Sequence, residues 1–200
     1  MSHTSESLRK AFHYFFPNEL SVLKSLVYLC PSSPITVLNI GAGAGTSGLA
    51  FLETRQDLHL HTVDITNIDS PFGSLYSERQ VCQDAGFKLG DRWHQHHMDS
   101  KLLAQWWDYG PVDVCFIDGD HTYDGCVGDI TGWLPHMRTG GFMAVHDYRK
   151  DSIIPGDNGF HVDGPHPIAF EGVDQAVDEF LKSQYEVFAL VESLIVFQVK

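Results

Sequence analysis

A glycine-rich turn between two apolar runs constrains the fold of this chain more than any other feature. An aliphatic and β-branched run ends at Ile40, Gly-Ala-Gly-Ala-Gly fills residues 41–45, an apolar helical face follows, and a second strand pattern closes on Asp64. This order predicts a β-loop-α-β unit. Glycine lets the backbone turn sharply against a ligand, free N–H groups at a helix start can hold an anionic group, and Asp64 can accept hydrogen bonds from ribose hydroxyls. We therefore predict a cofactor that carries a nucleoside.

The glycine spacing narrows the choice of cofactor. The dinucleotide fingerprint G-x-G-x-x-G, counted from Gly41, needs glycine where Thr46 stands; counted from Gly43 it needs Gly48, which is present. The pattern is better described as G-x-G-x-G. Because this shorter form has no pyrophosphate to hold, it favours a cofactor whose charged end is an amino acid. An NAD-dependent dehydrogenase is the weaker alternative, and a tight turn without a ligand is another.

Composition excludes several classes of protein. The 200 residues are 43% hydrophobic and fit a single domain. A formal net charge of -13 argues against nucleic acid as a partner. The sequence has no apolar stretch long enough to span a membrane and no charged-then-apolar leader. Its four cysteines show no CxxC spacing, which is typical of buried thiols in a cytoplasmic protein.

The order of the remaining patterns predicts a doubly wound α/β fold in three layers. Two helices, over 5–16 and 18–29, form an N-terminal cap over residues 1–34, and residues 35–200 form the core. We expect a mostly parallel sheet of seven strands, a C-terminal hairpin that supplies an antiparallel strand, and a lid formed by the loop 149–168. After Asp64 the expected strands cover 93–98, 112–117, 142–145, 185–190 and 193–199, and the expected helices cover 75–85, 101–107, 123–137 and 173–181.

Polar or glycine residues follow five successive strands of this predicted sheet, whose strand interiors are almost wholly apolar. A ligand of an open parallel sheet lies beyond the carboxyl ends of its strands, so these positions predict a site. For Asp99 alone, capping of the next helix is an equal alternative. The strand ends are residues 41–45, Asp64, Asp99 with Ser100, residues 118–121, and His146 with Asp147.

The glycine motif resembles motif I of the class I S-adenosylmethionine-dependent methyltransferases. Residues 116–123 and 140–148 resemble a small family that includes macrolide-sugar O-methyltransferases and cephalosporin hydroxylase-like proteins. One departure is Asn39, which stands two residues before Gly41 where relatives often have an acidic residue. The resemblance implies S-adenosylmethionine as the cofactor, bound by Gly41, Ala42, Gly43, Gly45, Thr46, Asp64, Ile65, Asp99, Ser100 and Asp118.

Three residues at adjacent strand ends form a candidate metal site. Asp118, His146 and Asp147 can converge, and carboxylates with an imidazole suit a hard or borderline divalent ion. The layout is similar to that of the catechol-type O-methyltransferases, which implies Mg²⁺, with Mn²⁺ or another ion as alternatives. In the alternative without a metal, His146 and Asp147 simply cap a loop.

His121 is the candidate catalytic base. An imidazole has a pKa near neutrality and can take the proton of a hydroxyl. In the macrolide-sugar enzymes a histidine after the same Asp-Gly-x sequence is assigned this role, and His121 matches it. Asp120 is a candidate neighbour of this base or an additional metal ligand. In the predicted lid, His161 and His166 could also reach substrate or metal. His94 and His96 face one side of their strand and His97 the other, so these three cannot bind one ion.

Together these features predict a metal-dependent O-methyltransferase acting on a hydroxyl of a small molecule, such as a sugar or a natural product. The alternatives are another activity on the same scaffold, as in the hydroxylase-like relatives, and a cofactor-binding protein without turnover. The sequence leaves open whether the protein forms a homo-oligomer.

Overall fold

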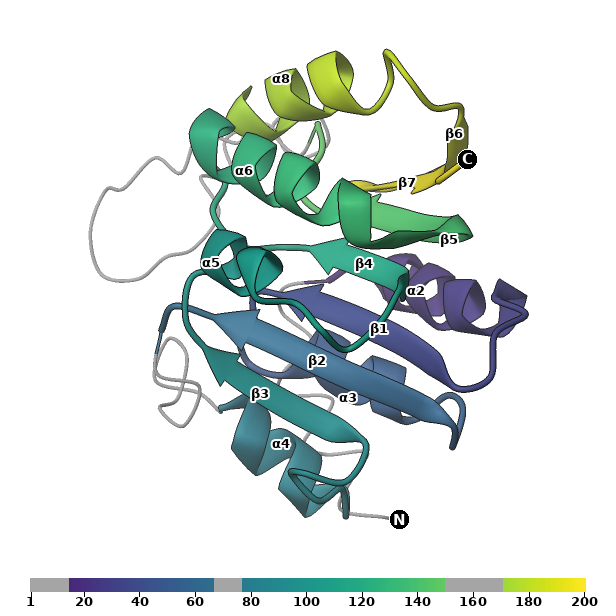
Figure 1. The fold of residues 1–200 in the computed structure, drawn as a ribbon, viewed down its shortest axis with the longest axis vertical. Helices are drawn as coiled ribbons and strands as arrows, with labels where there is room; N and C mark the ends of the chain where they lie inside the picture. The colour runs from purple at the N-terminus through teal and green to yellow at the C-terminus, as the bar shows by residue number, and fades with distance from the viewer. Residues whose placement is uncertain (1–14, 67–76, 150–170) are drawn as a thin grey trace.

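A single mixed sheet organises the chain in the computed structural model, which describes residues 15–66, 77–149 and 171–200 (Figure 1). The strand order is β3-β2-β1-β4-β5-β7-β6, and β7 runs antiparallel to both of its neighbours. The expected fold, a mostly parallel seven-stranded sheet with an antiparallel C-terminal strand, is confirmed. The strands are β1 (Ile35–Ile40), β2 (Leu58–Asp64), β3 (Trp93–His97), β4 (Val112–Ile117), β5 (Met137–Val145), β6 (Val187–Val191) and β7 (Leu194–Gln198).

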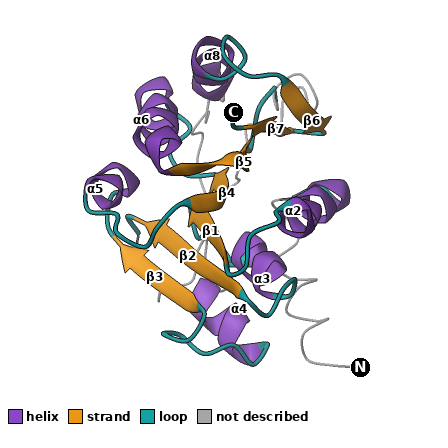
Figure 2. Ribbon diagram, turned by 45° about the vertical axis from the view of Figure 1, so that its right-hand side comes forward, coloured by secondary structure: helices purple, strands orange, loops and turns teal. Residues whose placement is uncertain are grey.

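Helices cover both faces of this sheet, as Figure 2 shows. Because side chains alternate between the two faces of a strand, the sheet separates two apolar cores; Val37 of β1 packs in one and Leu38 in the other. One face carries α2 (Pro17–Leu29), α3 (Thr46–Leu52) and α4 (Glu78–Asp84), and the other carries α5 (Ser100–Gln105), α6 (Tyr123–Trp133) and α8 (Glu171–Phe180).

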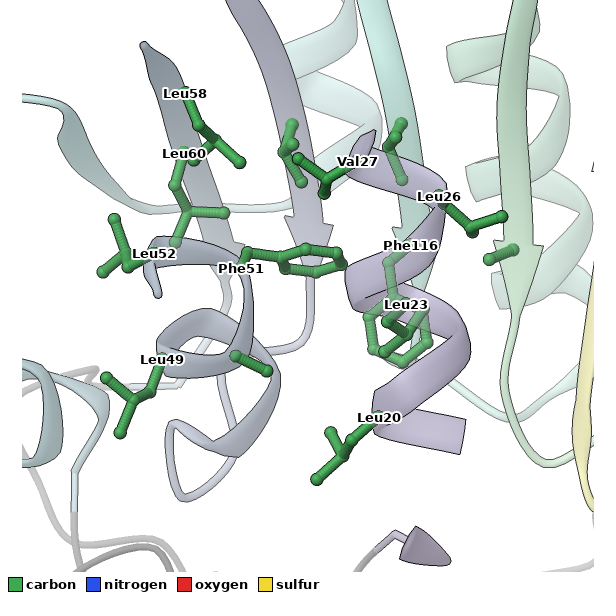
Figure 3. Close-up of a cluster of buried hydrophobic side chains, with 14 of the residues drawn as sticks. Leu20, Leu23, Leu26, Val27, Leu49, Phe51, Leu52, Leu58, Leu60 and Phe116 are labelled. Carbon is green, nitrogen blue, oxygen red and sulfur yellow. The ribbon is translucent and has the colours of Figure 1, made fainter. Parts of the chain in front are cut away.

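The N-terminal helix α2 belongs to the main core. Its Leu23 and Val27 are fully buried and lie in the same cluster as Phe51 of α3 and Phe116 of β4 (Figure 3). Burying each such side chain stabilises the fold by roughly 1.5–3 kcal/mol. The helix therefore packs over the sheet, and among the described residues up to Leu29 the pocket described below is lined only by Phe15, two residues before the helix.

Some element boundaries differ from those expected. The helix predicted over 123–137 ends at Trp133, because Pro135 lacks an N–H group and lies in the 3₁₀ turn Leu134–His136. The helix predicted over 75–85 begins at Glu78, with the Ser77 hydroxyl accepting a hydrogen bond from the Gln80 N–H. The helix expected over 5–16 and the lid expected over 149–168 lie outside the described residues, apart from two residues and one residue respectively.

Within the described ranges, no helix combines the length and the apolar character that crossing a membrane requires.

Candidate active site

The carboxyl ends of the parallel strands surround a pocket of about 430 Å³, within the size range of small-molecule sites. Within the described part of the chain, every candidate site residue from the sequence except Gly45 lines it. The pocket has a glycine-loop end, built after β1 and β2, and an acid-imidazole end, built after β4 and β5. The glycine-loop residues in the wall are Gly41, Ala42, Gly43, Ala44 and Thr46, with Asp64 and Ile65 beside them. Asp99 and Ser100 follow β3, and the other end contains Asp118, His121, His146 and Asp147.

Backbone conformation explains the glycines. Gly41, Gly43 and Gly45 have φ values of 91°, 47° and 85°, in the left-handed region that side chains disfavour. At Gly41 a Cβ atom would also lie 2.0 Å from the Asp118 carbonyl oxygen, so this glycine lets the loop pass directly against the end of β4. The loop leaves room for a ligand at Gly43, because a Cβ atom there would meet no atom of the described residues within 4 Å. Gly45 lies just behind the wall as the N-cap of α3.

Asp64 organises the same loop from the end of β2. Its Oδ2 accepts a hydrogen bond from the Ala42 N–H at 2.8 Å, and its Oδ1 accepts from the Thr66 N–H and hydroxyl, each at 2.7 Å. A carboxylate oxygen can accept two hydrogen bonds, so Oδ2 keeps capacity for a ligand hydroxyl. Asp64 thus combines a loop-holding role with the expected position for a ribose contact.

Asp99 and Ser100 have local partners as well as a place in the wall. Asp99 is the N-cap of α5 and accepts from the Lys101 N–H at 2.7 Å, the alternative considered for it. The Ser100 hydroxyl donates to Asp129, a buried residue of α6 that also lines the pocket. Burial raises the pKa of Asp129 to about 6. Asp129 was not among the residues selected from the sequence. The available signal was an acidic residue on the apolar face of a helix, beside Cys126, Ile130 and Trp133.

Asp118, His121 and Asp147 meet at the acid-imidazole end. His121 Nε2 lies 2.9 Å from Asp147 Oδ2 and 3.6 Å from Asp118 Oδ1. The three residues offer donor atoms that all lie within 4.8 Å of one another, a grouping that could hold a metal ion. Asp147 has φ 59°, a left-handed conformation that aspartate tolerates better than most residues and that recurs at functional sites.

The charges at this end support one another. Burial disfavours ionisation of Asp118, but His146 and His121 outweigh it and lower its pKa well below the ordinary range. Burial likewise disfavours the charged ring of His121, but its contacts to Asp118 and Asp147 raise its pKa to about 9. Without a metal, His121 therefore holds a proton at neutral pH.

His146 has partners beyond the metal site predicted for it. Its Nδ1 lies 3.2 Å from Asp118 Oδ1 and 3.2 Å from Asp147 Oδ1, and its Nε2 lies 3.0 Å from Glu19 Oε2. Both ring nitrogens thus face carboxylates. Burial disfavours the charged ring, but these carboxylates outweigh it and raise its pKa to about 10. Among the described residues the grouping suited to a metal contains His121 in the place expected for His146.

Two further sequence features lie away from the pocket wall. Asn39 is fully buried, and its side-chain amide has no hydrogen-bond partner within the described ranges. His94 and His96 share a face, as expected from their spacing. There they lie beside His61 of β2, with His61 Nδ1 3.1 Å from His96 Nε2 and the His61 and His94 rings stacked at 4.7 Å.

Comparison with known proteins identifies the family. Residues 38–148 match the family described as "Methyltransferase domain", which is more than half of the chain, so the chain belongs to this family. The matched range runs from β1 to the end of β5 and includes both ends of the pocket. A search of curated proteins finds no match to the sequence.

Solved structures share the fold at low sequence identity. An O-methyltransferase from Bacillus cereus in complex with S-adenosylhomocysteine superposes with a TM-score of 0.68 at 17% identity, over 98% of this chain and 90% of that one. An S-adenosylhomocysteine-bound methyltransferase from Podospora anserina gives 0.67 at 18% identity, over 100% and 90%. A candidate O-methyltransferase from Klebsiella pneumoniae gives 0.67 at 19%, over 98% and 88%. The class I methyltransferase fold inferred from the sequence is thereby confirmed.

Proposed function

We propose that this protein transfers the methyl group of S-adenosylmethionine to a hydroxyl of a small molecule, with the help of a divalent metal ion. One observation carries the proposal: a single pocket joins a glycine loop suited to the cofactor to a cluster of two carboxylates and an imidazole suited to metal and acid-base chemistry. Membership of the methyltransferase family and the S-adenosylhomocysteine bound by proteins of the same fold support the choice of cofactor.

The glycine-loop end holds the cofactor in this proposal. Asp64 accepts hydrogen bonds from the ribose hydroxyls, and the glycine backbone lets the cofactor lie against the loop. Asp99 and Ser100 contact the adenine. The buried Asp129 beside Ser100 is a further acceptor on this wall.

The acid-imidazole end holds the metal and the acceptor. Asp118 and Asp147 supply carboxylate oxygens, which Mg²⁺ and Mn²⁺ prefer, and His121 or His146 is the adjacent imidazole. A bound divalent ion would lower the pKa of the acceptor hydroxyl and, by its positive charge, that of His121.

His121 is the general base of the proposed reaction. The acceptor oxygen forms a bond to the methyl carbon while the bond from that carbon to the sulfonium sulfur breaks, which leaves neutral S-adenosylhomocysteine. The hydroxyl proton passes to the His121 ring. His121 can take this proton only after it has released to solvent the proton favoured by its contacts with Asp118 and Asp147, so base and metal are linked through the same two carboxylates.

The acceptor is a small molecule rather than a nucleic acid in this proposal. The formal net charge of -13 and the carboxylates at the acceptor end oppose a polyanion. A sugar or natural-product hydroxyl meets the chemical requirement, and the protein acts in the cytoplasm.

The proposal is tested by incubating the protein with methyl-labelled S-adenosylmethionine and a panel of catechols, phenols and deoxysugars, with Mg²⁺, with Mn²⁺ or with EDTA. We expect S-adenosylhomocysteine and a labelled ether to form together, and EDTA to stop both. Transfer that survives exhaustive chelation contradicts the metal role. A cofactor bound but never consumed favours a binding protein, and binding of NAD instead favours a dehydrogenase.

A further inference from the structure

Glu19 is a buried carboxylate that the reaction described above does not use. It lies in the first turn of α2, outside the matched methyltransferase range, and is fully buried. Its Oε1 accepts hydrogen bonds from the Ser193 N–H at 2.8 Å and the Ser193 hydroxyl at 2.7 Å. Its Oε2 accepts from the Phe16 N–H at 2.9 Å and lies 3.0 Å from His146 Nε2. One carboxylate thus connects α2, the β6-β7 turn and the end of β5.

His146 carries this connection into the pocket. The ring that faces Glu19 through Nε2 turns its Nδ1 toward both Asp118 and Asp147, at 3.2 Å from one oxygen of each. Two carboxylates this close repel each other unless a donor lies between them. The His146 ring is placed to be that donor, and the Phe15 ring packs against it at a tilt of 38°, with centroids 4.7 Å apart. The His146 ring is therefore contacted both by Glu19 in the first turn of α2 and by Phe15 just before that helix.

We propose that Glu19 is a positioning residue for the reaction centre, which acts through His146 to hold the carboxylates of Asp118 and Asp147 together. The inference rests on the proposed function for the ion that these carboxylates bind. It goes beyond that function by assigning a role to a residue outside the matched methyltransferase range. Partners of this kind orient metal ligands, and their loss typically lowers metal affinity about 10- to 100-fold.

A second buried carboxylate provides a matched control. Asp113 is 1% exposed and, like Glu19, ties distant elements together, because it accepts from the Thr36 N–H at 2.9 Å and pairs with Arg138 Nε at 2.7 Å. Asp113 is the second residue of β4 and lies at the end of that strand opposite the pocket. Neutralising Asp113 therefore removes a buried structural carboxylate without touching the reaction centre.

The test compares the binding of Mn²⁺ and of S-adenosylhomocysteine by calorimetry in wild type, Glu19→Gln, His146→Gln, the double variant and Asp113→Asn. We expect Glu19→Gln to weaken Mn²⁺ binding about tenfold or more, with S-adenosylhomocysteine affinity within about twofold of wild type. Because Glu19 acts through His146, the double variant should bind Mn²⁺ as weakly as His146→Gln alone. Asp113→Asn should lower the urea midpoint and leave both affinities unchanged.

Three results would overturn the proposal. Mn²⁺ binding in Glu19→Gln that equals or exceeds wild type removes the positioning role. Additive losses in the double variant mean that Glu19 does not act through His146. Equal losses in Mn²⁺ affinity for Glu19→Gln and Asp113→Asn reduce Glu19 to a structural residue. If Glu19→Gln does not fold, His146→Gln decides alone, and a Mn²⁺ affinity within twofold of wild type sinks the idea.

A spectroscopic measurement separates this inference from the proposed function. In metal-free protein, Glu19→Gln should shift the carboxyl ¹³C resonances of Asp118 and Asp147 and the ring ¹⁵N resonances of His146, whereas Asp113→Asn should not. If wild type binds no Mn²⁺ but these shifts occur, the metal role fails and the positioning stands. If the resonances of the two carboxylates do not move, the positioning fails whatever the metal does.

Discussion

The two ends of the pocket are built in different ways. The glycine-loop end depends on backbone, on three glycines with positive φ and a carboxylate that holds the Ala42 N–H, all within residues 41–64. The acid-imidazole end depends on side chains that meet from β4, β5 and α2, with Glu19 and His146 separated by 127 residues. A local backbone site is set by the sequence around it, whereas a site made of distant side chains exists only when the tertiary packing is complete. The two ends should therefore respond to substitution independently.

The largest expected effect tests the acid-imidazole end. In His121→Asn, turnover with an acceptor identified in the panel should fall by about 10² to 10⁴ because the base is lost. S-adenosylhomocysteine affinity should stay within twofold, as measured by calorimetry. His136→Asn, outside the pocket, is the control.

The same variant separates a base from a ligand. If Mn²⁺ binding disappears in His121→Asn, the residue is a metal ligand and Asp120 becomes the next candidate for the base. Near-normal turnover at neutral pH would mean that the ion alone activates the hydroxyl.

Asp147→Asn should produce the next largest effect. Removing one charged oxygen ligand should weaken Mn²⁺ binding by about 100-fold or more, because losing even a partner that only supports a ligand typically costs about 10- to 100-fold. Calorimetry with S-adenosylhomocysteine should give an unchanged affinity. Asp84→Asn makes the same change of charge on α4, outside the pocket, and should alter neither the Mn²⁺ affinity nor the S-adenosylhomocysteine affinity. A cofactor affinity that falls together with Mn²⁺ affinity would break the division into two ends.

The third prediction concerns the support behind the glycine loop. Glu78 is fully buried, and its carboxyl group accepts hydrogen bonds from the Thr62 hydroxyl at 2.8 Å and the Gln95 amide at 2.7 Å. It packs so closely against α3 that a Cβ atom at Gly48 would lie 2.1 Å from Glu78 Oε1. Burial raises its pKa from 4.5 to about 7. Between these two pKa values the folded state keeps the Glu78 proton that the unfolded state releases. The contribution of Glu78 to the free energy of unfolding is therefore complete below pH 4.5 and is lost as pH rises to 7.

Urea unfolding from pH 5 to pH 7 checks this sign. The free energy of unfolding should fall in wild type by about 2 kcal/mol more than in Glu78→Gln, whose side chain cannot ionise. Glu53→Gln, which removes a surface carboxylate paired with Lys24, controls for the change in charge. Parallel curves for wild type and Glu78→Gln would show that Glu78 ionises freely in the folded protein.

The smallest expected effect tests Asp64. Asp64→Ala should weaken S-adenosylhomocysteine binding about tenfold, because charge-assisted hydrogen bonds to the ribose are lost, while Mn²⁺ affinity stays unchanged. Asp57→Ala, the same change just before the opposite end of β2, is the matched control. Equal cofactor affinity in wild type and Asp64→Ala would remove the ribose assignment.

The contrast between the two ends also explains how much the sequence could predict. Hydrophobic period and turn residues predicted all seven strands and their doubly wound order, and glycine spacing predicted the loop at Gly41, because these signals are local. The ligand grouping contains His121 rather than His146, and both ring nitrogens of His146 face carboxylates, one of them that of Glu19 on a distant helix. Spacing along the chain contains no such information. Asp129 had a local signal, an acid among apolar residues of α6, but its place in the pocket depends on contact with Ser100 on another helix.

The central claim is that one pocket holds the cofactor at its glycine loop and a divalent ion at Asp118 and Asp147. A crystal structure with S-adenosylhomocysteine and Mn²⁺, with the ion located by anomalous scattering, tests this most directly. We predict ribose hydroxyls within hydrogen-bond distance of Asp64 and an anomalous peak within about 2.3 Å of oxygens from both Asp118 and Asp147. An ion bound elsewhere, or a cofactor that leaves Asp64 without a ribose contact, would contradict the account.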